Sequence, residues 1–92
     1  MFEVHPGSIL KEELEARHLS GNALALALRI NSGRVSEILN GKRGISPDTA
    51  LRLGRFFGND PQFWLSLQSA FDLAVASRED GERIAREVLP AA

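Results

Sequence analysis

Residues 20–40 read SGNALALALRINSGRVSEILN, and this stretch decides the fold. The alternation of Ala and Leu over 23–28 has the period of a strand, but both residue types are apolar and both are strong helix formers. Propensity therefore predicts a helix over 21–28, with Ser20 as its N-cap. After a turn of about four residues, Asn31 or Ser32 caps a second helix that runs to Asn40, where Gly41 supplies the stop.

Two helices this short, joined by so tight a turn, have the geometry of a helix-turn-helix, whose second helix enters the major groove of DNA. Projection at about 100° per residue places Val35, Ile38 and Leu39 together, facing the core. The opposite face is small and polar, with Arg34 on its flank, and consists of Gly33, Ser36, Glu37 and Asn40. Such a face suits the edges of bases. The alternative at this point is an ordinary three-helix bundle with a solvated polar face.

The rest of the chain adds further helices, so the expected fold class is all-α. His5-Pro6-Gly7-Ser8 opens a first helix that ends near His18, and Ser46-Pro47-Asp48 opens a fourth helix, which Gly58 ends. Asn59-Asp60-Pro61 starts a fifth helix, which Gly81 interrupts, leaving room for a short sixth helix over 82–89. The apolar residues expected to be buried are Ala50, Leu51, Leu53 and Phe57 in the fourth helix and Phe63, Trp64, Leu67, Phe71, Ala74 and Val75 in the fifth.

A chain of 92 residues fits one domain, expected to span 1–92, and no repeat or linker divides it. The net charge of −1 conceals a basic segment, because residues 29–55 carry six cations against two carboxylates, whereas 1–28 and 56–92 are acidic. Local charge determines what a surface attracts. The basic segment includes the second helix of the predicted motif, which favours DNA as a partner.

Composition and spacing also limit the other classes of function. The sequence has no cysteine, which excludes disulfides and thiolate metal sites. No apolar run approaches the roughly 18 residues of a membrane span, and residues 1–6 lack signal-peptide features, so we expect a cytoplasmic protein with no membrane partner.

Candidate catalytic and metal-binding residues are few, and each has a simpler interpretation. Glu12, Glu13 and Glu15 are expected to be solvated, and His5 and His18 lack a third ligand. Ser32 and Ser36 have no neighbouring base. The aromatic residues are expected in the core rather than as a base-stacking platform, namely Phe56, Phe57, Phe63, Trp64 and Phe71. We therefore expect no enzyme activity, no cofactor and no metal.

Several motifs stand in a characteristic order along residues 5–77, most of the chain. They are Pro6-Gly7-Ser8-Ile9-Leu10, Leu19-Ser20, Leu24-Ala25, Asn40-Gly41-Lys42-Arg43-Gly44-Ile45-Ser46, Asp48-Thr49-Ala50-Leu51-Arg52-Leu53 and Asp60-Pro61-Gln62-Phe63-Trp64-Leu65-Ser66-Leu67-Gln68. Together they resemble the HigA family of antitoxins, within the Xre helix-turn-helix superfamily. The resemblance implies a λ-repressor-like domain of five helices, with the helix-turn-helix at positions two and three. It also implies a HigB-type, RelE-like ribonuclease as partner and repression of the shared operon. The alternative is an Xre-type repressor without a toxin partner.

The sequence departs from this pattern at three positions. Gly21 stands where the superfamily usually has Gln, which removes one DNA contact and weakens the helix start. Arg29 stands where the turn usually has Gly, so a left-handed backbone would be strained. We expect the turn to relax, or Arg29 to compensate by contacting a phosphate. Leu26 projects away from Leu24, Ala25 and Leu28 and is expected to be exposed, with contact to a partner as the less favoured interpretation.

These inferences predict a homodimer that presents two copies of the second motif helix to major grooves about 34 Å apart, on an inverted-repeat operator. The expected base-reading residues are Ser32, Arg34, Ser36, Glu37 and Asn40, and the expected phosphate contacts are Arg29, Lys42 and Arg43. Arg52 and Arg55 are equally compatible with a structural role. The segment 61–89 is expected to form the dimer contact, because it carries more apolar residues than one small core needs; the alternative is that its end packs on its own subunit or frays.

Overall fold

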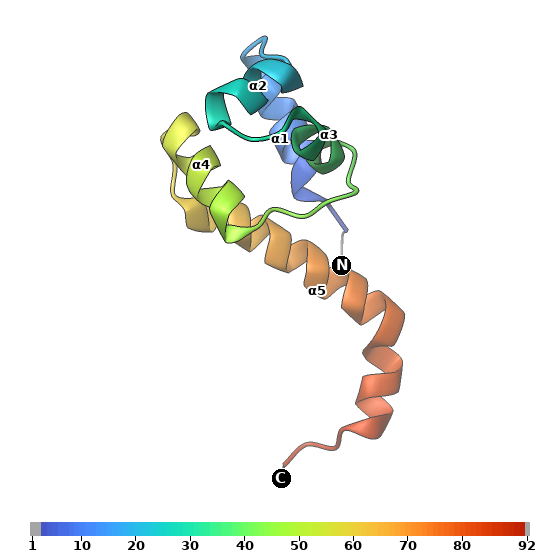
Figure 1. Ribbon diagram of the computed structural model, residues 1–92. Coiled ribbons are helices and arrows are strands. Elements are labelled where there is room, and N and C mark those ends of the chain that lie inside the picture. The colour runs from blue at the N-terminus through green and yellow to red at the C-terminus, as the bar shows by residue number, and fades with distance from the viewer. Residues whose placement is uncertain (1–2, 92) are drawn as a thin grey trace.

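The computed structural model describes residues 3–91 and folds them into five helices (Figure 1). The helices are α1 (Pro6–Ala16), α2 (Gly21–Leu28), α3 (Ser32–Leu39), α4 (Pro47–Phe57) and α5 (Pro61–Glu87). No strand occurs within this range, so the all-α prediction is confirmed. Residues 1, 2 and 92 lie outside the described part. They are the two ends of the predicted domain 1–92, and residues 1 and 2 also belong to the N-terminal segment that lacks signal-peptide features.

Each helix begins where a side chain accepts a hydrogen bond from a free backbone N–H of the first turn. The acceptors and their donors are His5 Nδ1 from Gly7 at 2.9 Å, Ser20 Oγ from Ala23 at 3.1 Å, Asn31 Oδ1 from Gly33 at 2.6 Å, Ser46 Oγ from Thr49 at 3.3 Å and Asp60 Oδ1 from Gln62 at 2.9 Å. Asn31, not Ser32, therefore caps α3, which leaves the hydroxyl of Ser32 available. All five starts agree with the sequence predictions, which rest on Asn31 or Ser32 for α3 and on Ser, Asp and Pro signals for the other four.

The core forms among α1 to α4 and the first half of α5, which packs against α4 and α1. Its largest fully buried side chains include Trp64, Leu10, Leu24, Ile38 and Leu53. Trp64 is also hydrogen-bonded, donating from Nε1 to Asn59 Oδ1 at 3.2 Å.

Several predicted core residues are not buried. Leu51 is 62% exposed, because the buried face of α4 consists of Thr49, Ala50, Leu53 and Gly54, and Leu51 points about 100° away from Ala50. Phe56 and Phe63 keep more than two fifths of their surface in solvent, so the predicted aromatic core reduces mainly to Trp64.

The first turn of α1 lies directly against α3. Gly7 is buried, and a Cβ at this position would overlap the carbonyl oxygen of Ile38. Only glycine permits this approach of two backbones. The contact sets where α3 sits relative to the rest of the bundle.

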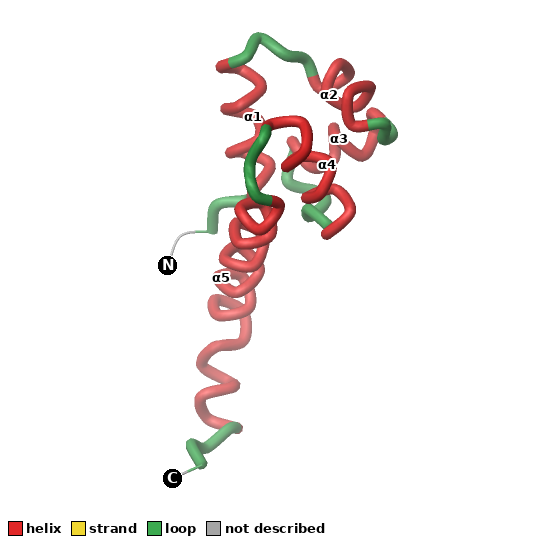
Figure 2. Tube along the Cα trace, turned by 90° about the vertical axis from the view of Figure 1, so that its left-hand side faces the viewer, coloured by secondary structure: helices red, strands yellow, loops and turns green. Residues whose placement is uncertain are grey.

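Helix α5 continues well past the bundle (Figures 1 and 2), and in Figure 1 it bends, so that its last turns run in a different direction from its first. Its 27 residues make the molecule 51 Å long but only 22 Å wide, with a radius of gyration of 15.8 Å. A compact domain of this length would have a radius of gyration of about 12 Å. In the second half of α5, Arg78 donates a hydrogen bond to the carboxylate of Glu3, so the N-terminal segment lies beside α5. No helix within residues 3–91 is both long and apolar enough to cross a membrane.

The predicted break at Gly81, and with it the short sixth helix, is wrong. Glycine in a helix interior costs only about 1 kcal/mol relative to alanine. Arg83 lies within 2.9 Å of the Asp80 carboxylate and within 3.1 Å of Glu87, and such pairs along a helix contribute a few tenths of a kcal/mol each. No proline stands between Pro61 and Pro90, so the helix continues through Gly81 to Glu87.

Candidate nucleic-acid interface

The turn between α2 and α3 is a tight left-handed cap. Arg29 has φ 61° and ψ 41°, the left-handed helical region. Its N–H donates to the carbonyl of Leu26 at 3.3 Å, and the N–H of Ile30 donates to the carbonyl of Ala25 at 3.1 Å. These two bonds form the Schellman pattern usually built on glycine. The expectation that the turn relaxes is therefore wrong: the left-handed conformation is kept, with its cost for a non-glycine residue.

Arg52 on α4 holds the end of α2. Its Nη1 donates to the carbonyl of Leu28 at 2.8 Å, and its Nε donates to Asp48 Oδ1 at 2.8 Å. The hydrogen bond from Arg52 lowers the pKa of the Asp48 carboxyl below its ordinary value, and the charge of Arg34 adds to this effect. Arg52 thus has a structural role. Arg55, on the exposed side of α4, carries its charge in solvent.

Helix α3 has the two faces that the sequence predicts. Val35 and Ile38 are buried and Leu39 is half-buried. On the other side, Ser32, Ser36 and Asn40 are exposed, and the amide of Asn40 donates to Ser36 Oγ at 3.4 Å. Arg34 and Glu37 are half-buried on the flanks. All five predicted base-reading residues therefore reach the surface of α3 or its C-terminal cap.

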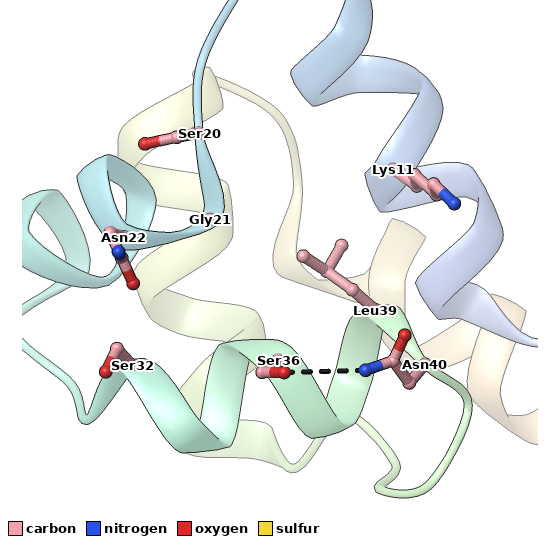
Figure 3. A pocket seen from close by; sticks show the side chains of 8 residues that line it. All are labelled: Lys11, Ser20, Gly21, Asn22, Ser32, Ser36, Leu39 and Asn40. Atoms are coloured by element: carbon pink, nitrogen blue, oxygen red, sulfur yellow. Dashed lines mark hydrogen bonds between the residues drawn. The ribbon is translucent and has the colours of Figure 1, made fainter.

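A polar groove of about 340 Å³ runs along this face (Figure 3). It is lined by Lys11 from α1, by Ser20, Gly21 and Asn22 at the start of α2, and by Ser32, Ser36, Leu39 and Asn40. The groove brings the predicted reading helix together with three side chains that the sequence did not single out for binding: Lys11, Ser20 and Asn22. Their common location depends on how α1 and α2 pack on α3, which no local sequence signal encodes.

Gly21 gives α2 its close packing on α3. A Cβ at this position would lie 3.3 Å from Leu39 Cδ1 and 3.7 Å from Val35 Cγ1. The helix start is nevertheless capped, by the hydrogen bond from Ala23 N to Ser20 Oγ. The predicted weakening of the start is thus limited, because the cap is formed without a side chain at Gly21.

The connection after α3 presents two cations at the surface. Gly41 has φ 74°, which turns the chain away from α3, and Lys42 and Arg43 follow it, both exposed. Arg43 Nε lies 3.4 Å from Glu37 Oε2 in a solvent-exposed ion pair. A predicted phosphate contact and a predicted base-reading residue are therefore paired with each other. An exposed pair of this kind is weak, so separating it costs about 1 kcal/mol or less.

The remaining candidate residues have local roles. His5 caps α1 and packs edge-on against Phe71, with 4.9 Å between ring centroids. His18 ends α1 with φ 53°. Within residues 3–91, no three His, Asp or Glu side chains gather as metal ligands. Leu26 is 77% exposed, as predicted, in a shallow depression that also involves Ala25 and Ile30.

The residues from Leu10 to Trp64 match the helix-turn-helix family model. Virulence-associated protein I of Dichelobacter nodosus is 51% identical over 80 residues, covering 86% of this chain and 74% of that protein. An addiction module antidote protein of the HigA family from Coxiella burnetii superposes with a TM-score of 0.95 at 50% identity, over 98% of this chain and 99% of that one.

A second solved structure, antitoxin HigA of Pseudomonas aeruginosa with the higBA promoter, superposes with a TM-score of 0.96 at 42% identity. The match covers 99% of this chain and all of that one, so it includes the projecting α5. On the motif, the fold and these relatives together, the chain belongs to the HigA family of helix-turn-helix proteins.

Proposed function

We propose that this protein is a DNA-binding antitoxin that, as a homodimer, represses its own toxin–antitoxin operon and neutralises a HigB-type, RelE-like ribonuclease. One observation carries the DNA-binding part: the polar face of α3 is exposed and lies between cations from the preceding turn and the following loop. The chain is also similar over almost its whole length to an antitoxin solved with its promoter. The protein acts by binding alone, in the cytoplasm, without catalysis, cofactor or metal.

The roles within the interface follow from chemistry and exposure. Asn40 suits adenine, Arg34 suits guanine, and Glu37 suits the amino group of cytosine once its ion pair with Arg43 opens. Ser32 and Ser36 donate and accept at either base type. The phosphate contacts, which position the helix without reading sequence, are Arg29, Lys42 and Arg43, to which we add Lys11 at the rim of the groove.

The dimer contact is assigned to the segment 61–89. Ala74 is the last buried residue of α5, and residues 82–91 are all exposed. An apolar stripe follows one side of α5, formed by Leu73, Ile84 and Val88, with Leu89 beside it. A spacing of 11 residues keeps Leu73 and Ile84 on the same face of the helix, and Val88, the extended C-terminal cap, follows about one turn after Ile84. A second copy that covers this stripe would place two α3 helices on an inverted repeat.

DNA binding is tested by the salt dependence of affinity for the DNA upstream of the protein's own gene and for random duplex. If Arg29, Lys42 and Arg43 each neutralise one phosphate, a dimer has a log–log slope near −5, and Lys11 as a fourth contact brings the slope to about −7. Arg17→Ala is the matched control, because it removes a half-exposed cation from the end of α1, outside both the groove and the segment 61–89. A slope near zero for the unaltered protein would refute DNA binding.

Toxin neutralisation is tested by co-expression with the neighbouring reading frame. The acidic segments before and after the basic middle suit a basic ribonuclease surface. Relief of growth arrest and co-purification of the two chains would support the antitoxin role. Operator binding with no relief of toxicity would favour the second candidate, an Xre-type repressor without a toxin partner, for which the exposed α3 face is sufficient.

A further inference from the structure

The segment between α3 and α4 carries Lys42 and Arg43 and is fastened at both ends. At its start, the N–H groups of Gly41 and Lys42 donate to the carbonyls of Ile38 at 3.1 Å and Glu37 at 2.8 Å. At its end, the side chain of Ile45 is 4% exposed and belongs to the core. Between these points the chain crosses the surface, so the direction of its peptide planes determines where the two cations are held.

A further contact to this segment comes from Gln68 on α5, 23 residues after Ile45. Gln68 Oε1 accepts a hydrogen bond from the N–H of Ile45 at 2.8 Å, and Gln68 Nε2 donates to Asp72 Oδ1 at 2.9 Å. A backbone N–H can only donate and a carboxylate can only accept, so the two bonds fix the orientation of the amide. Glutamine is the only residue type of this length that offers both an acceptor and a donor without charge.

Gly44 completes the arrangement. A Cβ on Gly44 would lie 3.0 Å from the Cδ, Oε1 and Nε2 atoms of Gln68. The amide therefore lies flat against the loop at a place where any side chain would push it away. The peptide plane between Gly44 and Ile45 is thus held from two sides, by a hydrogen bond and by contact.

We infer that Gln68 is the positioning residue for the phosphate-contacting loop: through Ile45 and Gly44 it holds Lys42 and Arg43 in place relative to α3. This inference rests on the proposed DNA binding. Gln68 itself touches no DNA, because its amide is directed at the loop and at Asp72. Without it, the loop keeps the anchoring of the Ile45 side chain but loses the bond that orients its backbone.

The test uses Gln68→Ala and a rescue pair. Gln68→Glu alone keeps the acceptor for Ile45 but brings two carboxylates together at the position of the 2.9 Å bond to Asp72. Adding Asp72→Asn restores that bond with donor and acceptor exchanged and leaves the net charge as in the unaltered protein. Gln62→Ala is the control, because Gln62 lies in the first turn of the same helix, well before the apolar stripe that begins at Leu73, and its side chain bonds along the helix, to Ser66 at 3.2 Å.

Two readouts distinguish positioning from general stability: amide hydrogen exchange at Ile45 and the salt slope of binding to random duplex DNA. In Gln68→Ala and Gln68→Glu, we expect faster exchange at Ile45 and affinity reduced about two- to tenfold. The magnitude of the slope should fall by about 2 for each phosphate that a subunit of the dimer no longer neutralises. Gln62→Ala and the double variant Gln68→Glu/Asp72→Asn should behave as the unaltered protein. The double variant also decides the matter if Gln68→Ala does not fold.

Three results would overturn the inference in different ways. If the unaltered protein shows the negative slope expected for DNA binding and folded Gln68→Ala shows the same slope and affinity, the role of Gln68 is refuted while DNA binding stands. If the unaltered protein shows no salt dependence, the proposed function is refuted and the inference with it. Failure of the double variant to restore Ile45 protection when the Gln68→Glu single variant has lost it would also contradict the geometry.

Discussion

Replacing Arg29 by glycine should stabilise the fold and weaken DNA binding in the same variant. Arg29 ends α2 with φ 61° and ψ 41°, a conformation that costs an ordinary L-residue about 1–2 kcal/mol. Glycine adopts it freely but gains about 0.4–1 kcal/mol of conformational freedom in the unfolded chain. The difference predicts a rise of about 0.5–1 kcal/mol in the free energy of unfolding. A protein of this size has about 5–14 kcal/mol in total, so the change is measurable.

Gly58→Ala is the reference for this strain. Gly58 ends α4 with φ 73°, and a Cβ there would meet nothing within 4 Å. Its replacement therefore adds the same backbone strain without a steric clash and should lower the free energy of unfolding by a similar amount, about 0.5–1 kcal/mol. Urea denaturation followed by the fluorescence of the buried Trp64 measures both variants. If Arg29→Gly is not more stable than the unaltered protein while Gly58→Ala is less stable, the strain argument for Arg29 is wrong.

The DNA arm of the same experiment asks why an arginine occupies this position. If Arg29 contacts a phosphate, Arg29→Gly should reduce the magnitude of the salt slope by about 2 for a dimer, on operator and random duplex alike. Arg29→Asn separates charge from strain, because asparagine tolerates the left-handed region but carries no cation. It should lose the same slope with little change in stability. An unchanged slope in both variants would remove Arg29 from the phosphate contacts.

Three further outcomes are expected. Gly7→Ala should lower the free energy of unfolding by about 1–3 kcal/mol, because its Cβ meets the backbone of α3. Gly81→Ala should raise the free energy of unfolding by about 0.5–1 kcal/mol, because its Cβ would meet nothing closer than Ser77 Oγ at 3.4 Å. Urea denaturation measures both variants. Arg34→Ala should relax discrimination at one base pair by about 1–3 kcal/mol, whereas Lys42→Ala should weaken all sequences alike, as competition titrations with single-base operator variants would show. Lys11→Ala should reduce the magnitude of the salt slope by about 2 for a dimer, and an unchanged slope would exclude Lys11 from the interface.

Helix boundaries could be predicted from the sequence because they depend on neighbours in the chain. Ser20 and Ser46 each place an acceptor before a run of helix formers, and the structure begins α2 and α4 at the next residue. The start of α1 was found from Pro6, although its cap is a histidine ring. The two faces of α3 were also predictable, since the 3.6-residue period assigns each side chain a direction as soon as the helix is recognised.

The errors arose where a local rule met a stronger or a distant interaction. Gly81 lowers helix propensity, but the ion pairs of Arg83 and the absence of proline allow the helix to continue. Arg29 disfavours the left-handed cap, but two backbone hydrogen bonds to α2 hold it there. Lys11 stands in no motif and Gln68 only ends a family motif, so neither role could be read locally: each side chain takes its place near α3 through the way α1 and α5 pack.

The continuity of α5 fixes the rotational phase between its two ends. A single continuous helix joins the buried Trp64 to Ile84 in the apolar stripe. Inserting one residue within 76–81 turns everything beyond it by about 100°, whereas inserting seven brings the stripe back to within about 20° of its original direction and about 10 Å further out. In the proposed dimer, changes of length in this helix should therefore be tolerated in whole heptads rather than residue by residue. The helix would then set the distance between the two copies of α3, while α3 itself contacts the bases.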